Sequence, residues 1–243
     1  MTGEAPDRVA SDGAGEVGLS DDALKVGRYF PTHIFSVKVP GCQVLNERLI
    51  EAIHAEQERD RTGVRKSNYP QLGGWHSQTK LHKNAAFAGL VQYVNAATDM
   101  MCRKLGYHES YRLNIGTMWS IVNPPGGSNR AHVHPGCIWS GVYYVQAPEN
   151  SGGLEFIDPR TENLMSPVKY IPGTKRPRDC WTKVRFKPLA GKMLIFPSWL
   201  YHGVGPNKST AGGKDADRII LSFNLSQVRR RKPQQHRPAG DPP

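Results

Sequence analysis

The stretch "AHVHPGCIWSGVYYVQ" (residues 131–146) decides the fold class that we predict for this chain. Two histidines, spaced i and i+2, precede an apolar run rich in β-branched and aromatic residues, which is typical of a buried strand. Side chains two apart on a strand leave on the same face, so His132 and His134 could bind one metal ion together. Iron(II) sites that activate oxygen usually add a carboxylate to two histidines, and this stretch contains none.

Similar short apolar runs follow one another on both sides of this stretch. They are separated by turn signals such as "NPPGGSN" and "APENSGG", and they are "YRLNIGTMWSIVN" (111–123), "GGLEFI" (152–157), "TKVRFKPL" (182–189), "GKMLIF" (191–196) and "RIILSFNL" (218–225). Many short strands with Gly/Pro turns indicate a sandwich or barrel. Upstream, an opening strand is expected over 28–40, and helical spacing predicts helices over 46–63 and 85–107, the second ending at Gly106 as its C-cap. We therefore expect a mainly β fold with flanking helices.

Length and composition favour one domain. The chain has 243 residues, 38% of them hydrophobic and 22% charged, which is ordinary for a globular protein. We expect a disordered acidic segment over 1–27, one domain over 28–228 with helical support at 42–107 and a β core at 108–228, and a disordered basic tail over 229–243. No apolar stretch approaches the roughly 20 residues that span a bilayer. The N-terminus has no apolar signal region, so a cytoplasmic location is expected.

The cysteine spacing bears on zinc binding, and the net charge bears on the kinds of partner that the protein could attract. Cys42, Cys102, Cys137 and Cys180 lie far apart, which argues against a zinc knuckle and predicts free thiols. The formal net charge is +11. A basic surface can attract nucleic acid, an acidic carrier protein or small anions, but base-stacking aromatics interleaved with Lys and Arg are not evident, so a nucleic-acid partner is not expected.

A third histidine follows a later apolar strand. His202 lies in "GKMLIFPSWLYHGVGPN" (191–207), about seventy residues after the first pair. The order of segments then matters: "HVHP" (132–135), "SGVYYVQ" (140–146), "GGLEFIDPR" (152–160), "FPSWLYHGVGPN" (196–207) and "RIILSFN" (218–224). This order resembles the iron(II)/2-oxoglutarate-dependent oxygenases of the prolyl-hydroxylase-like kind, and most closely a bacterial subgroup of them. The upstream "GGWHSQTKLHK" (73–83) also suits that subgroup.

The resemblance implies a double-stranded β-helix (jelly roll, cupin-like) core, with Fe(II), 2-oxoglutarate and O2 as cofactor and co-substrates. It implies hydroxylation, or a related oxidation, of an unactivated C–H bond, with decarboxylation of 2-oxoglutarate to succinate. Mapped onto this sequence, the metal ligands are His132, His134 and His202, with His134 at the position of the usual carboxylate. Neutral imidazole is a good iron ligand, so a three-histidine site is chemically reasonable. Asp158, at the end of "GGLEFID", is the fallback carboxylate.

The co-substrate and the substrate need residues of their own. The distal carboxylate of 2-oxoglutarate is best held by a guanidinium, and the resemblance places Arg218 there, with Ser222 and Tyr144 assisting. Trp119, Trp139, Trp199 and Tyr201 surround the motifs and are candidates for the substrate pocket. The basic loop 173–183 could act as a lid or contact an anionic substrate. A small-molecule, amino-acid, peptidyl or carrier-bound substrate is expected, no membrane association is expected, and the oligomeric state cannot be predicted.

Two other readings stay open at this level. A cupin-type metal enzyme without 2-oxoglutarate shares the jelly roll, and Gly126, Gly191 and Pro197 fit its motifs. Its glutamate is missing, however, because positions 138 and 139 are Ile and Trp, and it gives no reason for Arg218. The second reading is a basic binding module without catalytic activity, which gives no reason for the three histidines together.

Overall fold

The computed structural model of the chain describes residues 24–160, 165 and 168–230. Most of the two expected tails therefore lies outside the described residues. The strands are β1 (Phe35–Lys38), β2 (Trp75–His76), β3 (Tyr111–Asn123), β4 (Asn129–His132), β5 (Trp139–Gln146), β6 (Leu154–Ile157), β7 (Lys183–Phe186), β8 (Lys192–Pro197), β9 (His202–Val204) and β10 (Arg218–Arg229). The α-helices are α1 (Cys42–Arg59), α2 (Gly63–Lys66) and α3 (Ala88–Leu105), and the short 3-10 turns are η2 (Pro70–Leu72), η3 (Leu81–Lys83), η4 (Ala85–Phe87), η5 (Arg178–Cys180) and η6 (Gly213–Ala216).

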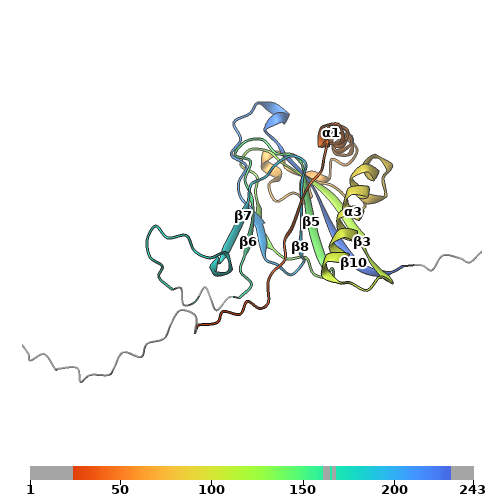
Figure 1. Cartoon of the computed structure of the whole chain (residues 1–243). Coiled ribbons are helices and arrows are strands. Elements are labelled where there is room, and N and C mark those ends of the chain that lie inside the picture. Colours follow the sequence, from red (N-terminus) through yellow and green to blue (C-terminus); the bar gives the residue numbers. More distant parts are fainter. Residues whose placement is uncertain (1–23, 161–164, 166–167, 231–243) are drawn as a thin grey trace, which may run out of the picture. The chain divides into compact units, whose positions relative to one another are not determined.

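The strands form two antiparallel sheets within the compact unit that begins at His33. The larger sheet has the order β1-β8-β5-β10-β3-β2, and the smaller has the order β4-β9-β6-β7. Figure 1 shows α1 and α3 on one side of the larger sheet and β6 and β7 on its other side. The expected class, a mainly β double-stranded β-helix with flanking helices, is confirmed.

Successive side chains of β5 point to opposite faces of the larger sheet, so they pack into two separate parts of the core. Tyr143 and Val145 belong to the cluster that packs against α1 and α3. Val142 and Tyr144 belong to the second cluster, together with Phe156 of the smaller sheet. Because the middle strands are covered on both faces, their sequences are continuous apolar runs instead of alternating ones.

The strand that carries the first histidines is interrupted. The side chains of His132 and Tyr144 would point to the same face only if one unbroken strand contained both residues. Instead, β4 ends at His132 in the smaller sheet and β5 begins at Trp139 in the larger one. A turn at Pro135–Gly136 separates them, with Gly136 at φ 81°. Since the turn resets the direction of the side chains, strand alternation does not relate His132 to Tyr144.

The helices lie close to the expected positions. Helix α3 ends at Gly106, whose left-handed φ of 68° is that of a C-cap glycine, as expected. Helix α1 begins at Cys42, earlier than the expected start at 46. All four cysteines are free thiols. In the described part of the chain, no helix has the length and apolar character needed to cross a membrane.

Candidate metal centre

Two short paired strands bring the three histidines together. His132 is the last residue of β4 and His202 the first of β9, and the two residues are direct partners in the antiparallel register. His134 follows in the turn, where its backbone N–H donates to the carbonyl of Ser198 at 2.9 Å. That bond ties the turn to the segment that leads into β9. The expected three histidines are therefore neighbours in space despite seventy intervening residues.

The donor atoms of these rings converge. One ring nitrogen from each histidine lies within 4.8 Å of the others. The Nε2 atoms of His134 and His202 are 3.2 Å apart. Two imidazole nitrogens bound to one ion at about 2.1 Å each lie roughly 3 Å apart, so this spacing fits a shared metal ion.

Backbone carbonyls orient two of the rings. The Nδ1 atoms of His132 and His202 lie 2.7 Å from the carbonyls of Arg130 and Leu200 respectively. A carbonyl can only accept, so each Nδ1 carries the proton and each Nε2 is left with its lone pair. This arrangement is the one that metal-binding histidines commonly have.

Burial keeps two of the rings neutral. His202 is 3% exposed, and burial, with a smaller contribution from the two neighbouring histidines, lowers its pKa to about 4. Burial and the charge of His132 lower the pKa of His134 to about 4 as well. Neutral imidazole is the form that binds metal ions, so the pocket favours binding at neutral pH.

The fallback carboxylate lies elsewhere. Asp158 accepts two hydrogen bonds from the side chain of Arg160, at 2.9 and 3.0 Å, and it is not a member of the histidine group. The donor set in the described chain is therefore three imidazoles. Imidazole suits Fe, Ni and Zn alike, so these residues fit an iron(II) ion whose protein ligands carry no negative charge.

A buried arginine lies in the same cavity. Arg218 is 1% exposed. Its Nη1 donates to the backbone carbonyls of Ser151 and Gly205, the latter at 3.0 Å, while Nε and Nη2 are buried without a partner. None of the ion pairs found in the described residues involves Arg218. A buried guanidinium with two unpartnered donor groups can bind an anion, which would offset the cost of burying it unpaired.

The two residues expected to assist Arg218, Tyr144 and Ser222, line the same cavity. Arg218, Ile220 and Ser222 alternate along one face of β10, and Ile220 pairs with Tyr144 of β5. Burial raises the pKa of Tyr144 to about 12, against a smaller opposing effect of the Arg218 charge. Burial also lowers the pKa of Arg218 to about 10. At neutral pH the pair is a phenol and a cation, which are both hydrogen-bond donors for a carboxylate.

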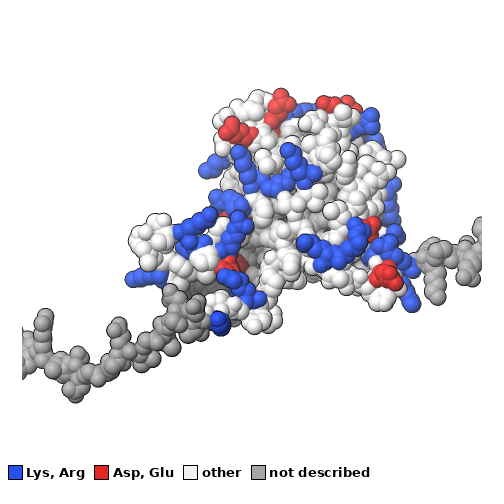
Figure 2. All heavy atoms as spheres, in the orientation of Figure 1, with Lys and Arg blue, Asp and Glu red and all other residues white. Residues whose placement is uncertain are grey.

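The histidines and Arg218 share one cavity of about 400 Å³ between the two sheets. Its lining also includes apolar residues of both sheets and a set of polar residues from outside the predicted motifs: Lys66, Ser67, Asn68, His76, Asn123, Asn129 and Arg130. Of the described residues that line it, none is acidic. On the face drawn in Figure 2, Lys and Arg side chains border a central hollow, and Asp and Glu side chains are sparse.

The predicted aromatic residues divide into two groups. Trp119 lines the cavity, and its ring centroid lies 5.7 Å from that of His134. Trp139 instead belongs to the core cluster on the helix side, where its Nε1 donates to the Tyr107 hydroxyl at 3.1 Å. This differs from the expectation because position 139 has the opposite parity to 142 and 144. Trp199 and Tyr201 are exposed and do not line the cavity.

The basic loop 173–183 does not line the cavity either. Its residues are mostly exposed, and the guanidinium of Arg176 lies 4.3 Å from the ring centroid of Tyr170. The role of this loop as a lid or a substrate contact stays a prediction.

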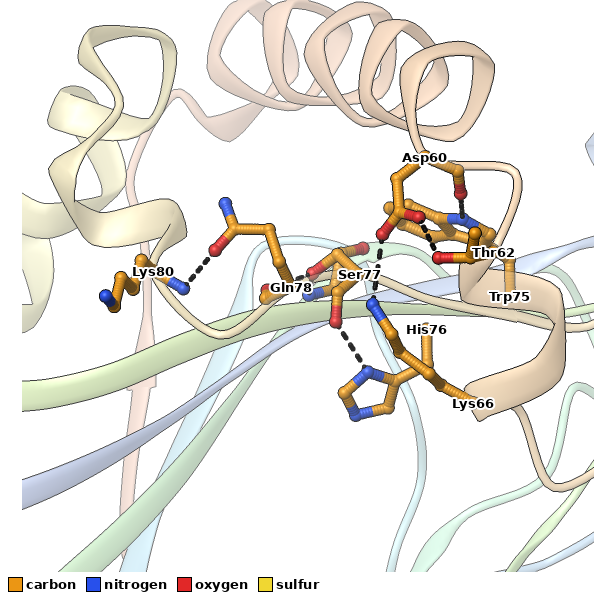
Figure 3. A network of polar contacts seen from close by, with 9 residues as sticks. Asp60, Thr62, Lys66, Trp75, His76, Ser77, Gln78 and Lys80 are labelled. Carbon is orange, nitrogen blue, oxygen red and sulfur yellow. Dashed lines mark hydrogen bonds and ion pairs between the residues drawn. The ribbon is translucent and has the colours of Figure 1, made fainter.

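One wall of the cavity was missed at the sequence level. The segment between α1 and α3 supplies Lys66 and His76, and Figure 3 shows the polar network that holds them. Asp60 accepts from Lys66 Nζ at 3.1 Å, and the Asp60 carbonyl accepts from Trp75 Nε1 at 2.9 Å. The one available signal was "GGWHSQTKLHK" (73–83), whose Trp and His stand in an otherwise Gly- and Lys-rich loop.

The chain thus combines two antiparallel sheets with three histidines that could hold a metal ion. Residues 117–224 match the family model described as "Putative 2OG-Fe(II) oxygenase". This segment contains the three histidines, Tyr144, Arg218 and Ser222. The expected resemblance to iron(II)/2-oxoglutarate-dependent oxygenases is therefore confirmed over this segment, and the match supports the expected enzyme class with Fe(II), 2-oxoglutarate and O2.

Solved structures agree on the fold. A prolyl hydroxylase from Trichoplax adhaerens, in complex with a hypoxia inducible factor peptide fragment, is 13% identical, with a TM-score of 0.51 over 79% of this chain and 83% of that one. HygX from Streptomyces hygroscopicus, with nickel, 2-oxoglutarate and hygromycin B bound, is 11% identical, with a TM-score of 0.51 over 80% and 83%. The non-heme monooxygenase ThoJ, as a nickel complex, is 14% identical, with a TM-score of 0.52 over 82% and 76%. No curated protein matches this chain.

Proposed function

We propose that this chain is an iron(II)- and 2-oxoglutarate-dependent oxygenase that hydroxylates an unactivated C–H bond at a centre with three histidine ligands. The observation that carries the proposal is the presence, in one cavity, of three converging imidazoles and a buried arginine with two unpartnered donor groups. The family match over 117–224 supports it. The cupin reading and the binding-module reading leave the buried, unpaired charge of Arg218 without a purpose.

Three side chains would hold the metal. These are His132, His134 and His202, and the carbonyls of Arg130 and Leu200 fix His132 and His202 in the tautomer that leaves Nε2 with its lone pair. When bound, iron(II) activates O2 at the expense of 2-oxoglutarate, which leaves as succinate and CO2. The protein supplies orientation and excludes water, since His202 and most of the inner cavity are buried.

Three further side chains would hold 2-oxoglutarate. Arg218 offers Nε and Nη2 to the distal carboxylate, and the Tyr144 and Ser222 hydroxyls donate to the same group. Because Arg218 is fixed by the carbonyls of Ser151 and Gly205, its guanidinium is oriented before the ligand arrives. Such preorganisation reduces the entropic cost of binding.

The substrate of the reaction is a small molecule, an amino acid or a peptidyl or carrier-bound residue. The solved structures named above include one with a bound peptide and one with a bound small molecule, so they do not choose between these classes. A cytoplasmic location stays a prediction from the sequence.

The test is anaerobic addition of iron(II) and 2-oxoglutarate to the metal-free protein, with the weak visible charge-transfer band of the chelate as the readout. We expect the band in the wild type, its loss or shift in His134→Ala, and its weakening in Arg218→Ala. His108→Gln, an exposed histidine outside the cavity, is the matched control. Tight binding of another metal without any band would favour a cupin-type enzyme, and absence of metal binding would contradict the enzyme assignment.

A further inference from the structure

His76 presents a hydrogen-bond acceptor to the cavity. Its Nδ1 lies 2.7 Å from the carbonyl of Ser77, so Nδ1 carries the proton and Nε2 has the lone pair. Figure 3 shows that this second nitrogen points away from the network that holds the ring. The residue is half-buried and lines the cavity. Burial lowers its pKa, so the ring is neutral and Nε2 accepts at neutral pH.

A stack of rings fixes His76 relative to the metal centre. The rings of His76 and Trp119 are stacked, with centroids 6.0 Å apart and an interplanar angle of 14°. The other neighbour of Trp119 is His134, at 5.7 Å. Ser77 secures the backbone of this wall, because its hydroxyl accepts from the Ser120 N–H of β3 at 2.9 Å. A molecule that contacts Nε2 of His76 therefore lies one indole ring away from the histidine site.

Among the described residues that line the cavity, two are cations besides Arg218. Arg130 lies on β4, two residues before His132, and is exposed, and none of the ion pairs in the described residues involves it. Lys66 comes from α2 and is bound to Asp60. Because no described lining residue is acidic, the described lining carries a net positive charge.

We propose that the substrate of this enzyme carries an anionic group, a carboxylate or a phosphate, that binds Arg130, and an N–H or O–H group that donates to Nε2 of His76. Lys66 contributes a second positive charge to the cavity lining. This inference rests on the proposed function, because it assumes that Arg218 is occupied by 2-oxoglutarate. Of the residues in the proposal, His76 and Lys66 lie in the segment between α1 and α3, outside the matched family segment, and Arg130 lies inside it.

The test uses a minimal probe, N-acetylglycine, which has one carboxylate and one amide N–H. Two matched probes each lack one of these features. N-acetylglycinamide has an uncharged amide in place of the carboxylate, and N-acetylsarcosine has a methyl group in place of the amide hydrogen. Binding is measured by ligand-observed saturation-transfer NMR on the full chain loaded with Zn(II), a diamagnetic ion that imidazole also binds, and with saturating 2-oxoglutarate. We expect N-acetylglycine to bind at least about tenfold more tightly than either matched probe, as for a charge-assisted hydrogen bond.

Variants assign each preference to a residue. Arg130→Gln should abolish the preference for the charged probe, and His76→Phe, which keeps a ring on Trp119, should abolish the preference for the N–H. Arg112→Gln and His108→Phe, both at exposed positions away from the cavity, should keep both preferences. His76→Gln keeps an acceptor oxygen and should retain part of the N–H preference, which guards against a misfolded His76→Phe.

Two results would overturn the inference: no probe binds, or the variants discriminate between the probes as the wild type does. Formation of the iron(II)/2-oxoglutarate band is measured on the same proteins. If the band is absent in the wild type, the proposed function fails. If the band forms and the probes are not discriminated, only the assignment of His76 and Arg130 fails.

Discussion

The Nε2 atoms of His134 and His202 lie 3.2 Å apart, and the two rings are nearly parallel, with an interplanar angle of 12°. The Nδ1–H of His202 donates a hydrogen bond to the Leu200 carbonyl, so the Nε2 of this ring carries a lone pair and no proton. A proton added to both rings would place two positive charges at hydrogen-bond distance in a buried site, which is unfavourable. The metal-free protein is thus held in a neutral state that is ready to bind an ion.

The first prediction concerns acid stability of the metal-free protein. The pKa of His202 is about 4 in the folded chain and about 6.5 when unfolded. Between these values the unfolded chain binds more protons, so the free energy of unfolding is highest above pH 6.5 and falls as the pH drops toward 4. For His202 alone the loss is on the order of 3 kcal/mol. Urea unfolding at pH 7.5, 5.5 and 4.5 measures it.

A variant distinguishes the contribution of His202 from that of the other groups that titrate over this pH range. In His202→Gln, which does not titrate, the decline over the same pH range should be clearly smaller than in the wild type. The same decline in both proteins would contradict the assignment.

The second prediction concerns the ligand that replaces the usual carboxylate. His134→Asp places a carboxylate beside His132 and His202 and recreates the common two-histidine, one-carboxylate set. We expect this variant to bind iron(II) and to shift the charge-transfer band of the chelate, because the ion gains an anionic ligand. His134→Ala should weaken iron(II) binding by at least about tenfold. Equal iron(II) affinity of His134→Ala and the wild type would show that His134 is not a ligand.

Much of the fold could be predicted from the sequence because the central strands have strong local signals. The expected strand over 111–123 coincides with β3, and 218–225 forms most of β10. Strands β4 and β9 were not predicted, because their sequences, NRAH and HGV, have no apolar run and they form by pairing with each other. The local sequence of each strand does not indicate that it pairs with a strand about seventy residues away. The interrupted strand at 132–139 depends in the same way on a switch between sheets.

The site residues could be predicted from the sequence only where they lie in the motifs whose order resembles the oxygenases. His132, His134, His202 and Arg218 were placed by the resemblance, and the structure brings them into one cavity. Trp139 could have been placed correctly by parity, since it alternates with Val142 and Tyr144. The contributions of His76 and Lys66 could not be predicted, because they come from an irregular segment whose position depends on tertiary hydrogen bonds such as Trp75 Nε1 to the Asp60 carbonyl.

The third prediction concerns the anion site. Arg218→Gln removes the charge that faces 2-oxoglutarate, and truncation of a buried charged partner costs about 2–5 kcal/mol. We expect 2-oxoglutarate affinity to fall by roughly 30-fold or more, while iron(II) binding without 2-oxoglutarate is kept. Titration of the charge-transfer band measures both. Tyr144→Phe, which loses one hydrogen bond, should weaken 2-oxoglutarate binding by only about fivefold. Loss of iron(II) binding in Arg218→Gln would indicate general unfolding instead.

The fourth prediction concerns the glycine that seats Arg218. Gly152 has a φ of 83°, and a Cβ there would overlap the carbonyl oxygen of Gly205 and lie 2.7 Å from that of Pro206 and 2.8 Å from Nη1 of Arg218. Gly152→Ala must therefore displace the carbonyl that holds the guanidinium. We expect it to lower the free energy of unfolding by at least about 2 kcal/mol and to weaken 2-oxoglutarate binding more than iron(II) binding.

Gly173→Ala is the matched control, because Gly173 has nearly the same φ, 79°, and a Cβ there meets nothing within 4 Å. Both variants place an alanine in the left-handed region, so the difference between them isolates the overlap around Arg218. Chemical unfolding and titration of the charge-transfer band are compared for the two proteins. If Gly152→Ala and Gly173→Ala have the same stability and the same 2-oxoglutarate affinity, the close approach at Gly152 does not position Arg218.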